Sequence, residues 1–143
     1  MAHQSPADSM AISTEIAPVS VSSAVNGTGV DMNGWDGVLF LVHVGAMGTA
    51  ATLDAKVQTH EDSSFSTGTV DVAGAALTQI LAATGASKEY GIDVWRPGEQ
   101  YVRIVLTQAT QTVLASVTSI RYRRTGRTPP TQTLTELIKV LAN

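Results

Sequence analysis

The sequence has no cysteine and few charged residues. Without cysteine, the chain can form no disulfide, no thiolate metal site and no thiol nucleophile. Charged residues make up 15% of its 143 residues, well below the share of about 25% in typical globular domains. Polar groups can then hardly cover the whole surface, so we expect part of it to be buried against other subunits. This favours an oligomer or a component of a larger assembly.

Other absences disfavour three further classes of protein. The net charge is −3, whereas binding to nucleic acid requires a positive surface that neutralises phosphates. No apolar run in the sequence approaches the roughly 20 residues of a membrane span. Residues 1–13 show no basic start followed by an apolar stretch, which disfavours a signal peptide. We therefore expect no nucleic-acid partner, no membrane partner, and synthesis in the cytoplasm.

Hydrophobic residues make up 43% of the chain, enough for one domain with a real core. The clearest strand covers residues 36–44, where Val38 and Phe40 alternate with Leu39 and Leu41. Successive residues of a strand point to opposite faces, so this strand is apolar on both. Such a strand must be covered on both sides, either by its own fold or by a neighbouring subunit.

Further segments alternate between apolar and polar residues. Residues 51–58 are typical of a strand with one buried face. Other candidate strands are residues 19–21, 69–72, 76–81, 90–95, 101–107 and 112–122. About eight short segments separated by turn residues predict an all-β fold, an antiparallel β-sandwich or a jelly-roll-like barrel, over residues 18–124. Residues 1–17 are rich in Ser, Ala and Pro and are predicted to form a flexible, extended N-terminal arm.

The last segment, residues 125–143, has a different pattern. Pro129-Pro130 ends the β region, and Thr133 followed by Glu136 matches a capping box. The apolar residues that then share one helical face are Leu134, Leu137, Ile138 and Leu141. We predict a linker and a short amphipathic helix. Because so short a helix is marginal alone, it must dock on its own sandwich or on a neighbouring subunit.

A search for catalytic or metal-binding residues yields no convincing site. The one local cluster of titratable residues is His60, Glu61 and Asp62, which lacks a second ligand set at a recognised metal spacing. We interpret it as a solvated loop tip, and His43 as a packed or interface residue. Glycine-rich segments lack the lysine of a P-loop, and no serine lies in a nucleophile elbow. We predict that the protein is not an enzyme and uses no catalytic residue, cofactor, metal or small-molecule substrate.

Four arginines form the one notable charge cluster: Arg121, Arg123, Arg124 and Arg127. They suit a docking patch for an acidic protein surface. They also suit the solvated end of a strand, where each arginine pairs with local acids. We predict that these arginines and the four apolar residues of the C-terminal helical face make contacts with other proteins.

Several stretches resemble a family of small structural proteins of tailed phages and prophages. They are residues 29–40 (GVDMNGWDGVLF), 55–58 (AKVQ), 93–97 (DVWRP), 100–103 (QYVR) and 120–122 (IRY), followed by Arg127 and Pro129. The resemblance covers about residues 19–132 and rests on packing and turn motifs. Proteins of this kind resemble capsid decoration (cement) proteins, which sit on the assembled head and are commonly β-rich trimers. The predicted C-terminal helix departs from that pattern.

The resemblance implies a virion protein on the capsid surface whose partners are itself, as a homotrimer, and the major capsid protein. Two alternatives remain open at this point. The chain could be a head–tail connector or tail component, which would form a ring or tube. It could also be a glycan-binding module of the virion, with Trp35, Trp95 and Tyr90 as a sugar platform.

Overall fold

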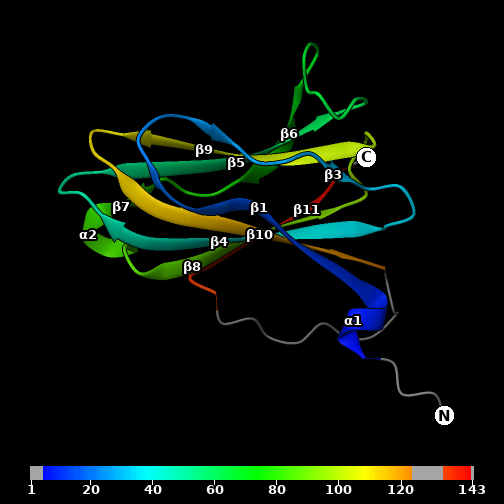
Figure 1. Cartoon of the computed structure of the whole chain (residues 1–143), viewed down its shortest axis with the longest axis horizontal. Coiled ribbons are helices and arrows are strands. Elements are labelled where there is room, and N and C mark those ends of the chain that lie inside the picture. Colours follow the sequence, from blue (N-terminus) through cyan, green and yellow to red (C-terminus); the bar gives the residue numbers. More distant parts are fainter. Residues whose placement is uncertain (1–4, 124–133, 143) are drawn as a thin grey trace.

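The computed structural model describes residues 5–123 and 134–142 of the chain. They form a sandwich of two β-sheets, called sheet A and sheet B here (Figure 1). Sheet A has the strand order β1-β10-β4-β8-β11. Its strands are β1 (Met10–Val21), β10 (Val113–Tyr122), β4 (Gly37–Met47), β8 (Lys88–Trp95) and β11 (Glu136–Leu141). All of its neighbouring strands are antiparallel except β8 and β11, which are parallel.

Sheet B has the order β2-β9-β5-β6, and two short strands pair beside this path. Its strands are β2 (Val25–Asn26), β9 (Tyr101–Ala109), β5 (Thr52–His60), β6 (Val70–Ala76), β3 (Val30–Asp31), which pairs with β9, and β7 (Ile80–Leu81), which pairs with β5. The helices α1 (Pro6–Ser9) and α2 (Ala82–Gly85) are single turns. The prediction of an all-β sandwich is confirmed, and over the described residues the two sheets do not close into a barrel.

The core lies between the sheets and is built from strands that alternate as predicted. In β4, Val38, Phe40 and Val42 point inward and are fully buried. In β9, Val102 and Ile104 do the same from the opposite sheet. Branched and aromatic side chains at every second position suit a pleated surface that is buried on one side. Strands β4 and β9 thus contribute half of the largest fully buried side chains between the sheets.

The predicted N-terminal arm is wrong from Met10 onward, because β1 begins there and pairs with β10 along its length. Its register shifts twice, between Thr14 and Ile16 and between Ile16 and Val19. A bulge inserts an extra residue and reverses the inward and outward alternation beyond it. In a strand with two such shifts, apolar and polar residues do not alternate with a sustained period of two. The sequence pattern therefore does not indicate a strand here.

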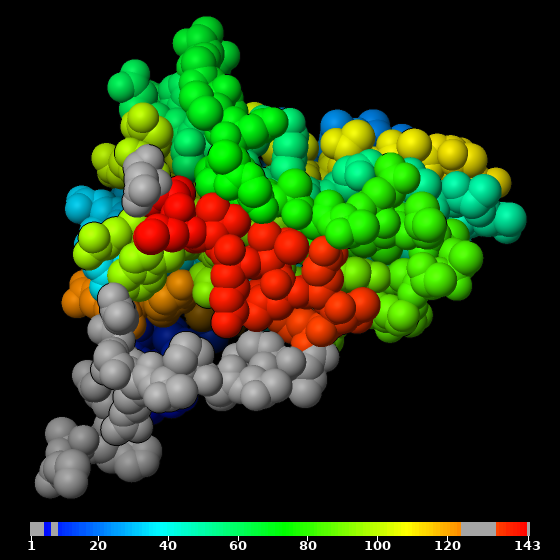
Figure 2. All heavy atoms as spheres, turned by 180° about the vertical axis from the view of Figure 1, so that it is seen from behind, coloured from blue at the N-terminus to red at the C-terminus, as the bar shows by residue number. Residues whose placement is uncertain are grey.

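The predicted C-terminal helix is also wrong. Glu136–Leu141 forms strand β11, which pairs in parallel with β8 in the same chain. The backbone N–H of Thr135 donates to the carbonyl of Glu89 at 2.9 Å, and that of Ala142 donates to the carbonyl of Trp95 at 3.0 Å. Figure 2 shows β11 (red) lying across the sandwich beside the green atoms of the β6 region.

The reason for this error is that two periodicities coincide in the same segment. The segment has apolar residues at helical spacing, and it also alternates like a strand. In the strand, Ile138 and Val140 point inward and pack against the core. The Glu136 carboxylate does not cap a helix. It accepts hydrogen bonds from the Thr78 backbone N–H and from the Thr78 hydroxyl, the latter at 2.8 Å. Pairing with β8 supplies backbone hydrogen bonds and apolar burial together, which outweighs the local helical preference.

Truncation of either central core residue should destabilise the fold. We expect Phe40→Ala and Ile104→Ala each to lower the free energy of unfolding by about 2–5 kcal/mol, because each leaves a cavity between the sheets. Val70→Ala is the control, since Val70 is 59% exposed, and should cost less than about 0.5 kcal/mol. Urea denaturation followed by circular dichroism measures all three. Unchanged midpoints for both core variants would contradict the strand assignment.

Two acidic substitutions distinguish strand β11 from the predicted helix. In the strand, Val140 packs against the core and Leu141 is 63% exposed, whereas in the helix Leu141 would lie on the docked face and Val140 would not. We expect Val140→Asp to cost about 1–3 kcal/mol because it places a charge against apolar groups. Leu141→Asp should leave the free energy of unfolding nearly unchanged. The opposite order would support the helix.

Candidate protein-interaction surface

The outward side of sheet A, which we call the outer A face, carries aliphatic side chains on four of its five strands. Cross-strand partners share a face, and Ile12 of β1, Ile120 of β10 and Leu39 of β4 follow one another across three strands. In the next row, Leu41 of β4 is separated from Leu137 of β11 only by a glycine. Of these side chains, Ile12 is 66% exposed and the others are half-buried. The two-sided apolar character predicted for residues 36–44 is thus confirmed by the structure.

Gly91, on β8, lies beneath the apolar side chains of the outer A face. A Cβ atom added there would come within 2.8 Å of the Cδ1 atoms of both Leu134 and Leu137, and within 3.4 Å of Leu39 Cδ1. The leucines therefore close over the glycine and join β4 to β11. Because of this packing, the predicted interaction residues Leu134 and Leu137 belong to the outer A face, whereas Ile138 belongs to the core.

The polar groups of the outer A face mostly have partners within it. The Tyr122 hydroxyl donates to the Asp93 carboxylate, and the Tyr122 ring stacks on Trp95 with 6.1 Å between centroids. Burial raises the pKa of the Asp93 carboxyl, and burial together with the Asp93 carboxylate raises the pKa of Tyr122, so the phenol keeps its proton. His43 Nδ1 lies 3.4 Å from the Glu89 carboxylate. Over residues 5–123 and 134–142, the face therefore offers little unpaired charge.

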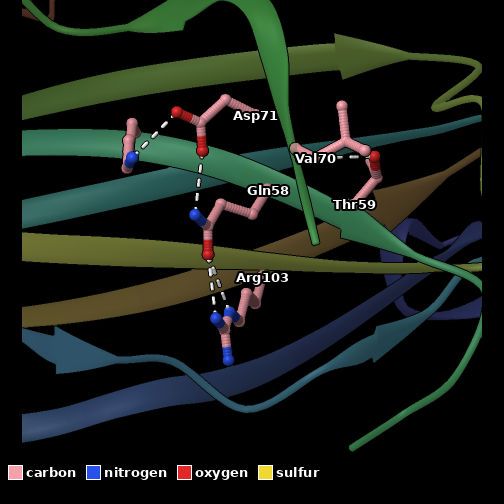
Figure 3. Close-up of polar contacts among 6 residues, drawn as sticks. Gln58, Thr59, Val70, Asp71 and Arg103 are labelled. Atoms are coloured by element: carbon pink, nitrogen blue, oxygen red, sulfur yellow. Dashed lines mark hydrogen bonds and ion pairs between the residues drawn. The ribbon is translucent and has the colours of Figure 1, made fainter. Parts of the chain in front are cut away.

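The outward side of sheet B, the outer B face, is polar and internally hydrogen-bonded (Figure 3). The Gln58 amide lies between Asp71 and Arg103: its Nε2 donates to Asp71 at 2.8 Å, and its Oε1 accepts from Arg103 Nη2 at 2.9 Å. Lys56 donates to the same aspartate at 2.8 Å. These hydrogen bonds, first the one from Lys56, lower the pKa of Asp71. A row of mutually satisfied polar groups is a stable solvent surface, in contrast to the outer A face.

Two of the predicted interaction arginines hold a loop of the same chain. Arg121 Nη1 donates to the Asp31 carbonyl at 2.7 Å, and Arg123 Nε donates to the Gly34 carbonyl at 2.9 Å. Both guanidinium carbons lie 5.3 Å from the Trp35 ring centroid, a distance at which cation–π attraction is significant. Arg124 and Arg127 lie outside the described residues. The placement of Arg121 and Arg123 favours the local, structural interpretation of these two arginines.

This arginine-held loop is part of one end of the sandwich, where four of the stretches that carry the phage-protein resemblance converge: residues 29–40, 93–97, 100–103 and 120–122. The Met32 N–H donates to the Gln100 carbonyl at 2.8 Å, and the Arg96 N–H donates to the Asp36 carbonyl at 2.8 Å. An open hollow of about 490 Å³ lies here, lined by residues 32–36, 96–97 and 99–100. These four stretches are therefore one packed unit, although the residues in contact are up to 90 positions apart in the sequence.

The three aromatic residues considered for a sugar platform do not form one. Tyr90 is buried in the core, and its hydroxyl donates to the Gly85 carbonyl at 3.3 Å. Trp95 lies on the outer A face and Trp35 between two arginines. A platform for a glycan requires exposed rings side by side, and a buried Tyr90 cannot contribute to it.

The interpretation of His60, Glu61 and Asp62 as a solvated loop tip holds for Glu61 and Asp62 but is wrong for His60. His60 is buried and donates from Nε2 to the Thr67 carbonyl. Its Nδ1 accepts from the Asp62 N–H at 2.8 Å when the ring is neutral and donates to the Asp62 carbonyl at 3.0 Å when the ring is protonated. Its ring lies 5.6 Å from that of Phe65, over which Arg103 is placed at 4.5 Å. His60 thus fastens the loop between β5 and β6. In the described part of the chain, no three His, Cys, Asp or Glu residues gather as metal ligands.

Comparisons with known proteins show a shared fold but no family. No family model matches the chain, and no curated protein matches its sequence. Among solved structures, PBSX exported protein XepA is similar with a TM-score of 0.58 and 9% identity over 86% of this chain and 40% of XepA. This chain thus spans about two fifths of the length of XepA. At this identity, the similarity shows the fold alone.

Two other solved structures are more distant. A protein of Bacillus endospore appendages, described as disulfide-linked pili, has a TM-score of 0.44 and 13% identity over 82% of this chain and 90% of that chain. The VP2 subviral particle of infectious bursal disease virus has a TM-score of 0.43 and 12% identity over 80% of this chain and 32% of that chain.

In residues 5–123 and 134–142, no helix is long and apolar enough to cross a bilayer.

The role of His60 in the loop predicts a pH dependence of stability. The Thr67 carbonyl, as the largest cause, raises the pKa of His60 above its ordinary value. The protonated form is therefore favoured in the folded state, and the stability that it contributes is fully present below a pH of about 6.5 and lost as the pH rises through the folded pKa. We expect the difference in free energy of unfolding between the parent and His60→Gln to fall from about pH 5.5 to pH 8. A difference that grows with pH would contradict this assignment.

Proposed function

We propose that the chain is a structural protein of a tailed-phage virion, specifically a decoration (cement) protein on the outer surface of the head shell. The observation that carries this proposal is the contrast between the two outward faces. The outer B face satisfies its polar groups internally, whereas the outer A face presents half-buried and exposed aliphatic side chains. Such a surface is typical of a protein whose work is to bind other proteins.

Two further observations support this role. Four of the stretches that resemble tailed-phage structural proteins, residues 29–40, 93–97, 100–103 and 120–122, converge on one end of the sandwich and are held there by main-chain hydrogen bonds. The fold is also that of a PBSX exported protein, although this chain covers only 40% of it. A role in assembly would further account for the low share of charged residues, 15% of the chain.

A cement protein works without chemistry, by mass action. Molecules that bind the closed shell more tightly than separated capsid subunits stabilise the shell by RT ln(1 + [L]/Kd) for each site. Many identical weak sites on one particle add up to a large stabilisation. A rigid sandwich suits this work, because little conformational entropy is lost when it binds. We infer the major capsid protein as the partner and a homotrimer as the bound form.

Binding to purified heads tests the proposal. Empty heads of the phage that encodes the chain, prepared without it, should bind the protein in regular copies on the outer shell. They should also withstand a higher temperature before opening, because binding favours the closed state. Cryo-electron microscopy and a thermal shift of the heads measure the two effects. Heads without the protein, mixed with a misfolded Phe40→Asp variant, provide the control.

Other locations would contradict the decoration role. Density only at the portal or along the tail would make the chain a connector or tail component. Heads that bind no protein and open at an unchanged temperature would contradict a role on the shell altogether.

A further inference from the structure

We propose that the outer A face is the surface through which copies of this chain associate, so that its occupant is a second copy of the same chain. This inference rests on the proposed structural role and deepens it, because it separates the contact between copies from the contact with the shell.

The edges of sheet A are poorly suited to joining copies. At one edge, β1 contains Pro18, which has no N–H to donate, and its register shifts twice. Glu15 in this strand is buried and accepts hydrogen bonds from Ser13 and from Ser119, the latter at 2.6 Å. Proline, bulges and an inward-pointing charge are features by which proteins prevent edge-to-edge pairing. Two copies are therefore not expected to join through β1.

The opposite edge is similarly protected. There β11 lies against β6 as well as β8, so that it covers the side of the sandwich (Figure 2). The exposed Lys139 projects from its outward side, and a lysine on an edge strand disfavours pairing with another chain. Because pairing with another chain is disfavoured at both edges of sheet A, the apolar area of this sheet that a partner can cover is its outward face.

The charges of the outer A face determine which kind of partner fits. The Glu89 carboxylate lies 3.4 Å from His43 Nδ1. Asp93 accepts a hydrogen bond from the Tyr122 hydroxyl, and Lys139 is the cross-strand partner of Asp93. Among the described residues of this face, both carboxylates are thus engaged by neighbouring side chains. A phospholipid surface or a strongly charged protein would require a surplus of one sign. An apolar, nearly neutral surface is instead matched by another of the same kind, which a second copy supplies.

The size of the face is adequate for such a contact. Five strands at a spacing of about 4.8 Å, each contributing about six residues at 3.4 Å, cover roughly 500 Å² in projection. Side-chain relief makes the accessible area larger, which brings it near the roughly 800 Å² per partner of a stable interface. The exposed side chains that extend it at its margins are Met10, Ile12, Leu114 and Leu141. A second copy covering this face would bury all of the rows described above.

Sedimentation equilibrium of three variants tests the proposal. Leu41→Lys places a charge at the centre of the face, and Ile12→Lys places one at a margin where the side chain is 66% exposed and folding should be unaffected. Each should weaken self-association about tenfold or more, because a buried unpaired charge opposes docking. Thr107→Lys on the outer B face is the matched control and should associate like the parent. Circular dichroism confirms that each variant is folded.

The possible results separate this inference from the proposed function. A parent chain that sediments as a monomer at about 100 µM overturns the inference, as does an Ile12→Lys variant that folds and associates like the parent. Self-association through this face without binding to heads would support the inference and contradict the decoration role. Binding of a monomer to heads would support the decoration role and contradict the inference.

Discussion

Strand β4 is the constraint from which the rest of the architecture follows. It lies in the middle of sheet A, between β10 and β8, and carries apolar side chains on both faces. Its inward residues, with Phe40 at the centre, require a second sheet to cover them, and β5 and β9 supply it. Its outward residues, Leu39 and Leu41, are only half-buried by the chain itself. Since burial of apolar surface contributes about 25 cal/mol per Å², the same strand that stabilises the monomer also favours a partner.

The outward faces of the two sheets carry different kinds of side chain. On the outer B face, Gln58 links Asp71 to Arg103, and the polar side chains satisfy one another. On the outer A face, one aliphatic row runs from β1 to β4, and leucines of β4 and β11 pack closely over Gly91 of β8. This asymmetry gives the sandwich one side suited to solvent and one side suited to protein. The side suited to protein carries few charged residues, which accounts for the low share of charged residues in the sequence.

The sequence permits prediction of the strands that alternate regularly and are buried on at least one side. Strands β4, β5 and β9 were predictable for this reason, since inward residues such as Phe40, Leu53 and Ile104 recur with a period of two. Strand β1 was not, because its two register shifts break the period. Strand β11 was mistaken for a helix, because its pairing with β8 depends on a partner that lies 46 residues earlier in the register and that no local pattern reveals.

The interaction surface shows the same limit. The two-sided character of β4 indicated that a partner or another part of the fold must cover it; the fold covers the inward side and leaves Leu39 and Leu41 half-buried. The arginine cluster was a weaker guide, since Arg121 and Arg123 are engaged by Trp35 and by backbone carbonyls of the loop before β4. Contacts that join residues 90 positions apart are set by the topology, so only the folded chain separates arginines that hold a loop from arginines that are available to a partner.

The difference between the two outward faces is measured most directly by cysteine labelling, because the parent chain contains no cysteine. Thr118 on the outer A face and Thr107 on the outer B face are replaced singly by cysteine, and the rate of reaction with a maleimide is followed in dilute protein and in the assembled state. We expect assembly to slow the labelling of Thr118→Cys strongly and to leave that of Thr107→Cys nearly unchanged. Equal protection of both positions, or protection of Thr107→Cys alone, would contradict this expectation.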